Sequence, residues 1–229
     1  MKLLIKASVS FLLIGYVIFL YISGKIVASI GISVFILGSL YEFYGLCEKL
    51  QLKPLKVPGL LISILLIYEA YKNNLEGMIH VLLLTILGTF LILILDKRHL
   101  SNALLDAAVT IFGLLYVVFP MCHLILLCVY PCESRPNGLD LFLFIILCNS
   151  TCDMSANGIG SWLGRHKILT HVSPNKSIEG TLGGIIMAVL IAIPVGYFIK
   201  FPFYHSLLGG LCIAITGVIG DFGESLIKR

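Results

Sequence analysis

Charged residues are scarce in this sequence of 229 residues. They make up 12% of the chain, whereas hydrophobic residues make up 59%, and the mean hydropathy is +1.03. A soluble domain is about one-quarter charged and spreads its charges over the whole surface. Here the charges gather in short clusters between long apolar runs. The composition excludes a single soluble domain and predicts a membrane protein whose loops carry the charged clusters.

Cysteine motifs for metal binding are also absent. The seven cysteines lie in or beside apolar runs, with no CxxC pair and no histidine at the spacing of a zinc site, so we expect them to be small packing residues. The sequence also lacks a low-complexity linker and an evident inverted repeat of the transporter kind. We therefore expect one membrane domain, in which residues 1–138 form N-terminal transmembrane helices and residues 139–229 form a catalytic-type transmembrane region.

Long apolar runs are what the sequence has in abundance. A helix needs about 20 apolar residues to cross the hydrocarbon core, and the runs predict an all-α, polytopic membrane protein with about eight transmembrane helices. The expected spans cover residues 4–22, 26–46, 57–71, 78–95, 103–130, 139–157, 180–199 and 205–220. The fifth run contains Pro120, so it is either one kinked helix or a hairpin of two short helices.

The distribution of lysine and arginine favours one helix in the fifth run. With one helix, 12 of the 16 basic residues lie on the side of the two termini, and four lie opposite. With two helices the division is 9 against 7. Because cytoplasmic loops retain Lys and Arg, we expect both termini and the loop 158–179 to be cytoplasmic. The expected location is a bacterial inner membrane.

A polar stripe runs along the sixth expected span. Asp153 lies within it, and a carboxylate at membrane depth needs a partner, a cation or a water-filled cavity. At about 100° per residue, the same arc of the helix carries Asn149, Ala156, Asn157, Gly160 and Gly164. The stripe predicts either the lining of a polar pocket or a close helix-packing face built on a GxxxG pair.

The segment that follows combines basic residues with a helix start. Arg165, His166 and Lys167 come directly after the stripe. Ser173 before Pro174 is typical of a capped helix whose free N–H groups would form an anion site beside Lys176. The alternative is an ordinary capped helix with basic anchors at the membrane interface.

The last ten residues, GDFGESLIKR, place further charges together. If they are helical, one face carries Asp221, Glu224, Ser225 and Lys228. Two carboxylates there suit Mg²⁺, which prefers a few carboxylates together with substrate phosphates. The alternative is an ion pair between Glu224 and Lys228, four residues apart.

Taken in order, these three segments resemble the phosphatidate cytidylyltransferase family, also called CDP-diacylglycerol synthases. The first is similar to the family pattern D-x-x-A-Y-x-x-G-x-x-x-G-[KR]-H-K, with Asn157 in place of Tyr. Residues 173–180, SPNKSIEG, are similar to SPKKTWEG, with Ile178 in place of Trp. Residues 220–229 are similar to GDLxESxxKR.

The resemblance implies transfer of CMP from CTP to phosphatidate, giving CDP-diacylglycerol and pyrophosphate in phospholipid biosynthesis, with Mg²⁺ as cofactor. It implies that the catalytic residues are Asp221, Glu224 and Lys228, and that Asp221 and Asp153 bind the metal. The substrate-binding residues that it implies are Ser173, Lys176, Asp153, Asn157, His166, Lys167, Ser225 and Arg229. The expected partners are CTP, phosphatidate and membrane lipid, without nucleic acid, and the sequence leaves a homodimer open.

The family pattern continues beyond the final Lys-Arg pair, through K-D-x-G into P-G-H-G-G-x-L-D-R-x-D, and this continuation is not in the chain. We therefore expect incomplete coordination of Mg²⁺ and the phosphates, and weak or no activity of the chain alone. An incomplete sequence, a separate C-terminal chain or an inactive relative would each account for it. The alternative functions are a CTP-dependent polyprenol kinase, a small transporter and a lipid-binding scaffold.

Overall fold

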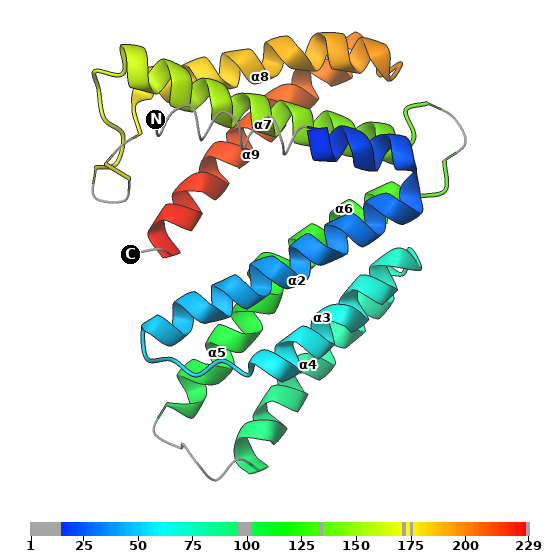
Figure 1. Cartoon of the computed structure of the whole chain (residues 1–229), viewed down its shortest axis with the longest axis vertical. Helices are drawn as coiled ribbons and strands as arrows, with labels where there is room; N and C mark the ends of the chain where they lie inside the picture. Colours follow the sequence, from blue (N-terminus) through cyan, green and yellow to red (C-terminus); the bar gives the residue numbers. More distant parts are fainter. Residues whose placement is uncertain (1–14, 96–101, 133–134, 171–172, 175, 228–229) are drawn as a thin grey trace. The chain divides into compact units, whose positions relative to one another are not determined.

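The computed structural model describes residues 15–95, 102–132, 135–170, 173–174 and 176–227. This part of the chain is helical, which confirms the all-α prediction (Figure 1). The helices are α2 (Lys25–Lys49), α3 (Lys56–Tyr71), α4 (Leu75–Leu95), α5 (Ala103–Gly113), η1 (Leu114–Val118), α6 (Phe119–Val129), α7 (Gly138–Leu163), α8 (Ile178–Phe198) and α9 (Phe203–Ile227). Residues 15–23 are also helical.

Six helices within the described ranges are long and apolar enough to cross a membrane, so the chain is a polytopic membrane protein. They are α2, α4, the continuous helix Ala103–Val129, α7, α8 and α9. The third expected span forms α3, which has 16 residues. At 1.5 Å per residue it is about 24 Å long, shorter than the hydrocarbon core of about 30 Å. Most of the first expected span lies outside the described residues.

The fifth apolar run forms one helix, as the charge distribution predicted. It contains a π-helical segment, η1, directly before Phe119 and Pro120. Proline lacks an N–H group, and its ring clashes with the carbonyl group four residues earlier. A π turn changes the hydrogen-bonding register at that point, which lets the helix continue through Pro120 instead of breaking into a hairpin.

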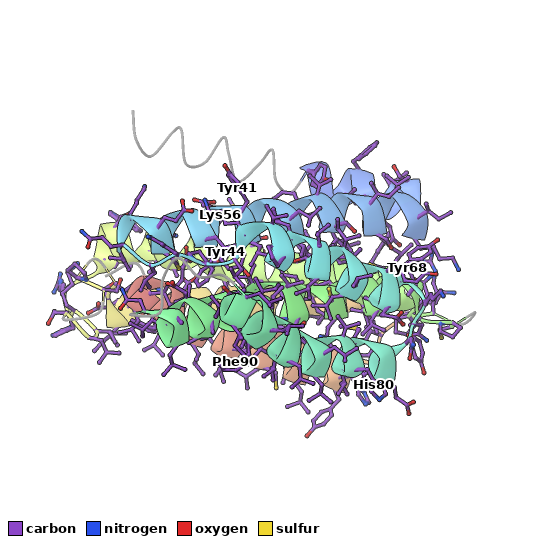
Figure 2. The ribbon with its side chains drawn as sticks, turned by 90° about the horizontal axis from the view of Figure 1, so that it is seen from below. Tyr41, Tyr44, Lys56, Tyr68, His80 and Phe90 are labelled. Carbon is purple, nitrogen blue, oxygen red and sulfur yellow. The ribbon has the colours of Figure 1, made fainter. Side chains whose placement is uncertain are left out.

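The chain divides into two compact units: Ser23–Pro131, here the N-terminal unit, and Met1–Ile22 with Cys132–Arg229, here the C-terminal unit. Tyr44 of α2 forms the centre of the N-terminal unit (Figure 2). Its hydroxyl group donates to the carbonyl oxygen of Thr110, 2.9 Å away, and its ring fills the space left by Gly59 and Gly113. Nearby, the backbone N–H of Lys53 donates to Asp106 at 2.7 Å. These bonds fix the connection between α2 and α3 on α5.

In the C-terminal unit, α7, α8 and α9 pack against one another (Figure 1). Asn137 caps α7 by accepting from the N–H of Asp140, and Asp140 accepts in return from the N–H of Asn137. Such a capping box satisfies two backbone donors that would otherwise be unpaired. Asp140 also accepts from the hydroxyl group of Tyr21 at 2.7 Å, which ties residues 15–23 to this helix.

Two element boundaries differ from the predicted ones. The loop expected at 158–179 covers residues 164–177, because α7 continues to Leu163. Glycine lowers helix propensity by only about 1 kcal/mol, and tertiary packing at Gly160 offsets this cost. The last span was expected at 205–220, but α9 runs to Ile227, so the described part of the GDFGESLIKR segment is helical.

Exposed aromatic side chains mark both ends of the C-terminal unit. Trp162, near the end of α7, is 85% exposed, and Tyr197, near the end of α8, is 87% exposed. Tryptophan and tyrosine collect at the two membrane–water interfaces, so their placement agrees with helices that span the bilayer. All seven cysteines are free thiols, and the packing role expected for them holds for the five that are buried, which are Cys47, Cys122, Cys128, Cys148 and Cys152.

Candidate functional site

The three charged segments meet within the C-terminal unit. Lys176, two residues before the start of α8, places its Nζ 2.9 Å from the Oδ2 atom of Asp221 on α9. The same ammonium group lies 4.4 Å from the ring centroid of Phe222. Asp153 on α7 interacts electrostatically with Asp221, Lys176 and Glu224. Residues that are far apart in the sequence therefore form one charged cluster.

This cluster gathers carboxylates around a lysine. Asp153 interacts electrostatically with the carboxylates of Asp221 and Glu224 and with the ammonium group of Lys176, which is paired with Asp221. The side chains of Lys176 and Asp221 are 26% and 41% exposed, so the cluster is accessible from the surface. Gathering like charges costs free energy unless a cation offsets them. The arrangement therefore favours binding of a cation together with a ligand.

The polar stripe of α7 contacts two helices, α8 and α9. Its small residues pack on α8: a methyl group on Gly180 would lie 2.7 Å from both the carbonyl oxygen of Ala156 and the Cα of Gly160. Its polar residues lie toward α9, where the amide of Asn149 packs on Gly217. The Nδ2 atom of Asn149 is 3.5 Å from Asp153. The packing interpretation holds for the glycines, whereas Asp153 belongs to the charged cluster.

The helix start predicted at Ser173 is wrong. Helix α8 begins at Ile178, and its cap is Ser177, whose Oγ accepts from the N–H of Gly180 at 3.2 Å. The N–H of Ile178 donates to the carbonyl oxygen of His166. Two amides of the first turn are thus already bonded, so the expected anion site of free N–H groups is not formed there. Ser177, not Ser173, stands directly before the apolar run, which is where a cap is expected.

The loop 164–177 is closed by contacts between its two ends. The N–H of Ile168 donates to the carbonyl oxygen of Lys176 at 3.1 Å, and Lys167 and Ser177 form an isolated antiparallel bridge. Glu179 accepts hydrogen bonds from the N–H groups of Arg165 and His166. The two arms of the loop therefore lie side by side and carry Lys176 toward Asp221.

The remaining expected site residues differ in how they relate to this cluster. Asn157 is exposed and donates to the carbonyl oxygen of Asp153 at 2.8 Å. Ser225 donates to the carbonyl oxygen of Asp221 at 2.8 Å. His166 contacts Glu179, and Lys167 is exposed on the loop. Lys228 and Arg229 lie outside the described residues.

Two contacts of the site were missed by sequence reasoning. Phe222 lies beneath the ammonium group of Lys176, and its position directly after Asp221 on an exposed helix end was the available signal. Glu179 was recognised within the SPNKSIEG segment without a structural role. A carboxylate in the first turn of a helix is expected to lie near the amides of that same turn. The amides that Glu179 contacts instead belong to the preceding arm of the loop.

A model of the cytidylyltransferase family matches residues 5–229. The chain belongs to the cytidylyltransferase family. Among its relatives, the phosphatidate cytidylyltransferase of Staphylococcus aureus (strain COL) is 28% identical over 207 residues, covering 87% of this chain and 77% of the relative. That of Staphylococcus epidermidis is 29% identical over 184 residues, covering 78% and 68%. That of Staphylococcus saprophyticus is 26% identical over 207 residues, covering 87% and 77%.

Membership in the cytidylyltransferase family makes the chain a nucleotidyltransferase enzyme. It confirms the resemblance inferred from the three motif segments, all of which lie within the matched residues. Neither a polyprenol kinase nor a transporter is favoured by these relatives. The charged cluster of the C-terminal unit is the candidate active site of this cytidylyltransferase.

Proposed function

We propose that this cytidylyltransferase transfers CMP from CTP to phosphatidate, giving CDP-diacylglycerol and pyrophosphate. The observation that carries the proposal is the contact of Lys176 with Asp221 at 2.9 Å, beside Asp153, in a chain whose relatives are phosphatidate cytidylyltransferases. This contact joins the second and third motif segments, and Asp153 adds the first. A site that gathers carboxylates and a lysine at a membrane helix end suits a triphosphate and a charged lipid.

The reaction needs no nucleophile from the protein. An oxygen of the phosphatidate phosphate forms a bond to the α-phosphorus of CTP, and the bond from that phosphorus to the bridging oxygen breaks. Pyrophosphate leaves with the electron pair. The task of the chain is to hold the two substrates in line and to offset their negative charge. Lys176, oriented by Asp221, supplies positive charge to the phosphates, and Ser173 and Lys228 are proposed to bind them further.

Asp153 and Asp221 fit a magnesium ion. Mg²⁺ is bound by one or two carboxylates together with substrate phosphates and water, and these two carboxylates come from neighbouring helices. Asp221 already binds one cation, the ammonium group of Lys176. Among the described residues, no three His, Cys, Asp or Glu side chains form a metal site by themselves, so substrate phosphates would complete the coordination. Bound Mg²⁺ would offset charge on the phosphates as a Lewis acid.

We propose that eight spans place both termini and the loop 164–177 in the cytoplasm. The six apolar helices, α3 and the first apolar run together supply eight. The side that carries 12 of the 16 basic residues is then cytoplasmic, as the positive-inside rule requires. Since CTP is a cytoplasmic nucleotide, the site would face its supply. The bacterial relatives support a location in the bacterial cell membrane.

The test is formation of CDP-diacylglycerol from labelled CTP and phosphatidate in detergent micelles with Mg²⁺. We expect Asp221→Asn and Lys176→Ala each to lower the rate about 100-fold, because each removes a charge that the phosphates or the metal require. Lys56→Ala is the matched control, because Lys56 forms an ion pair with Glu48 in the N-terminal unit. Its length of 2.7 Å is similar to that of the Lys176–Asp221 pair. Unchanged rates in both site variants, or transfer of the γ-phosphate to a polyprenol instead of CMP to phosphatidate, would contradict the proposal.

A further inference from the structure

Glu179 makes an unusual set of contacts for a partly exposed glutamate. It is the second residue of α8, and its Oε2 accepts from the N–H of Arg165 at 3.1 Å. Its Oε1 accepts from the N–H of His166 at 3.2 Å and lies 2.6 Å from the Nδ1 of the same residue. One carboxylate thus binds two consecutive backbone amides just beyond the end of α7.

The backbone contacts tie Glu179 to the loop itself. The side chain of His166 is 75% exposed, so its contact with Glu179 is open to water. The side chain of Glu179 is only 28% exposed, and hydrogen bonds from backbone N–H groups to a carboxylate are charge-assisted. Breaking them would leave backbone donors of the loop without their partner.

These contacts close the loop at its base. From there the arms pair through Ile178 N–H to His166 O at 2.9 Å and Ile168 N–H to Lys176 O at 3.1 Å. The second of these bonds holds the backbone of Lys176 itself. A lysine side chain has four rotatable bonds and loses considerable entropy when it is fixed. Holding its backbone in place lowers the entropy cost of keeping its ammonium group on Asp221.

We propose that Glu179 is a positioning residue that holds Lys176 at Asp221 by linking the two arms of the loop through hydrogen bonds. Glu179 acts through the backbone of Arg165 and His166 and has no contact of its own with the Lys176–Asp221 pair in the described structure. Its consequence for catalysis rests on the proposed function. The positioning of Lys176 by Glu179 does not rest on it, because it concerns only where the amine of Lys176 lies.

The test measures the reactivity of that amine. The purified full-length chain, without CTP, is labelled briefly with acetic anhydride, and the acetylation of Lys176 is measured by mass spectrometry relative to Lys167. Lys167 is exposed on the same loop and serves as an internal standard, whereas Lys176 is shielded by Asp221 and Phe222. We expect Glu179→Ala to raise the Lys176-to-Lys167 ratio about tenfold, from the loss of at least two charge-assisted hydrogen bonds.

Two further variants make the result specific. Glu179→Gln keeps one acceptor oxygen and the side-chain volume, so its ratio should lie between those of the wild type and Glu179→Ala. Glu48→Ala removes an exposed glutamate that pairs only with the Lys56 side chain in the described contacts, and it should leave the ratio unchanged. A Glu179→Ala ratio equal to that of the wild type, in a chain with an unchanged melting temperature, overturns the proposal.

The catalytic consequence has its own readout. In Glu179→Ala, KM for CTP should rise about tenfold while kcat falls less, because the lysine is displaced and not removed. A raised labelling ratio with unchanged KM and kcat would overturn the role of the Glu179 hydrogen bonds in substrate binding. If the wild type transfers no CMP at all, the proposed function fails, while the labelling ratio still decides whether Glu179 positions Lys176.

Discussion

The polar network around Tyr44 in the N-terminal unit and the charged cluster in the C-terminal unit use polar side chains differently. In the N-terminal unit, Asp106 and Thr110 of α5 accept from the backbone N–H groups of Lys53 and Leu55, at 2.7 and 2.9 Å. Tyr44 donates to the carbonyl oxygen of Thr110. Every one of these bonds pairs a side chain with a backbone group of another segment. Such polar groups stabilise the fold by pairing backbone groups that would otherwise lack a partner.

In the charged cluster of the C-terminal unit, charged side chains interact with one another instead. Asp221 binds the Lys176 ammonium group, and Asp153 interacts electrostatically with Asp221, Lys176 and Glu224. An arrangement of this kind lowers stability unless a ligand completes it, which is typical of a functional site. The comparison shows that a carboxylate at membrane depth is informative only once its partners are known.

Neutralising one carboxylate in each unit is the strongest test of the contrast between the two units. We expect Asp153→Asn to lower CMP transfer about 100-fold, because the cluster loses a charge that the metal requires. Asp106→Asn keeps the oxygen that accepts from Lys53, so its activity per folded molecule should equal that of the wild type. Rates are measured with labelled CTP and normalised to the folded fraction from size-exclusion chromatography.

The reverse pattern would refute the division of roles between the units. If Asp106→Asn loses as much activity as Asp153→Asn, then the polar network of the N-terminal unit contributes to catalysis. If Asp153→Asn instead changes only the melting temperature, then Asp153 is a packing residue, as the GxxxG interpretation of the stripe would have it.

Hydropathy was sufficient to predict the class of fold, because a bilayer imposes helices of a known length. It placed α4 and α8 within a few residues of their observed bounds, and charge counting predicted one helix through Pro120. Helix ends were harder to predict. In the last turn of α7, Gly160 packs on Gly180 of α8, and no local sequence pattern contains a contact between different elements.

The site was predictable as a set of motif segments and not as a geometry. Asp153, Lys176 and Asp221 were all named from their patterns, because charges near apolar runs stand out in sequence. The hydrogen bonds of Glu179 were not predicted, since they join a side chain to the backbone amides of Arg165 and His166 across a loop. Backbone donors are the same in every residue, so sequence alone does not reveal which of them a carboxylate will bind.

A second prediction concerns the packing that supports the site. We expect Gly180→Ala to destabilise the chain by about 1–3 kcal/mol, because its methyl group would meet backbone atoms of α7, which cannot move aside as a side chain can. Gly158→Ala has open space around the new methyl group and gains the same helix propensity. The measurement is the thermal unfolding midpoint of both variants in detergent. Equal midpoints would show that α7 and α8 do not approach as closely as the glycines suggest.

The smallest effect is expected in the N-terminal unit. Tyr44→Phe removes the hydroxyl group that donates to the carbonyl oxygen of Thr110 and keeps the ring between Gly59 and Gly113, so stability should fall by about 1 kcal/mol. Tyr41→Phe is the matched control, since Tyr41 is 60% exposed and its ring contact with Lys56 needs no hydroxyl group. CMP transfer per folded molecule should be unchanged in both variants, because neither touches the charged cluster. A loss of transfer in Tyr44→Phe without a loss of stability would mean that this network serves the reaction and would remove the contrast between the two units.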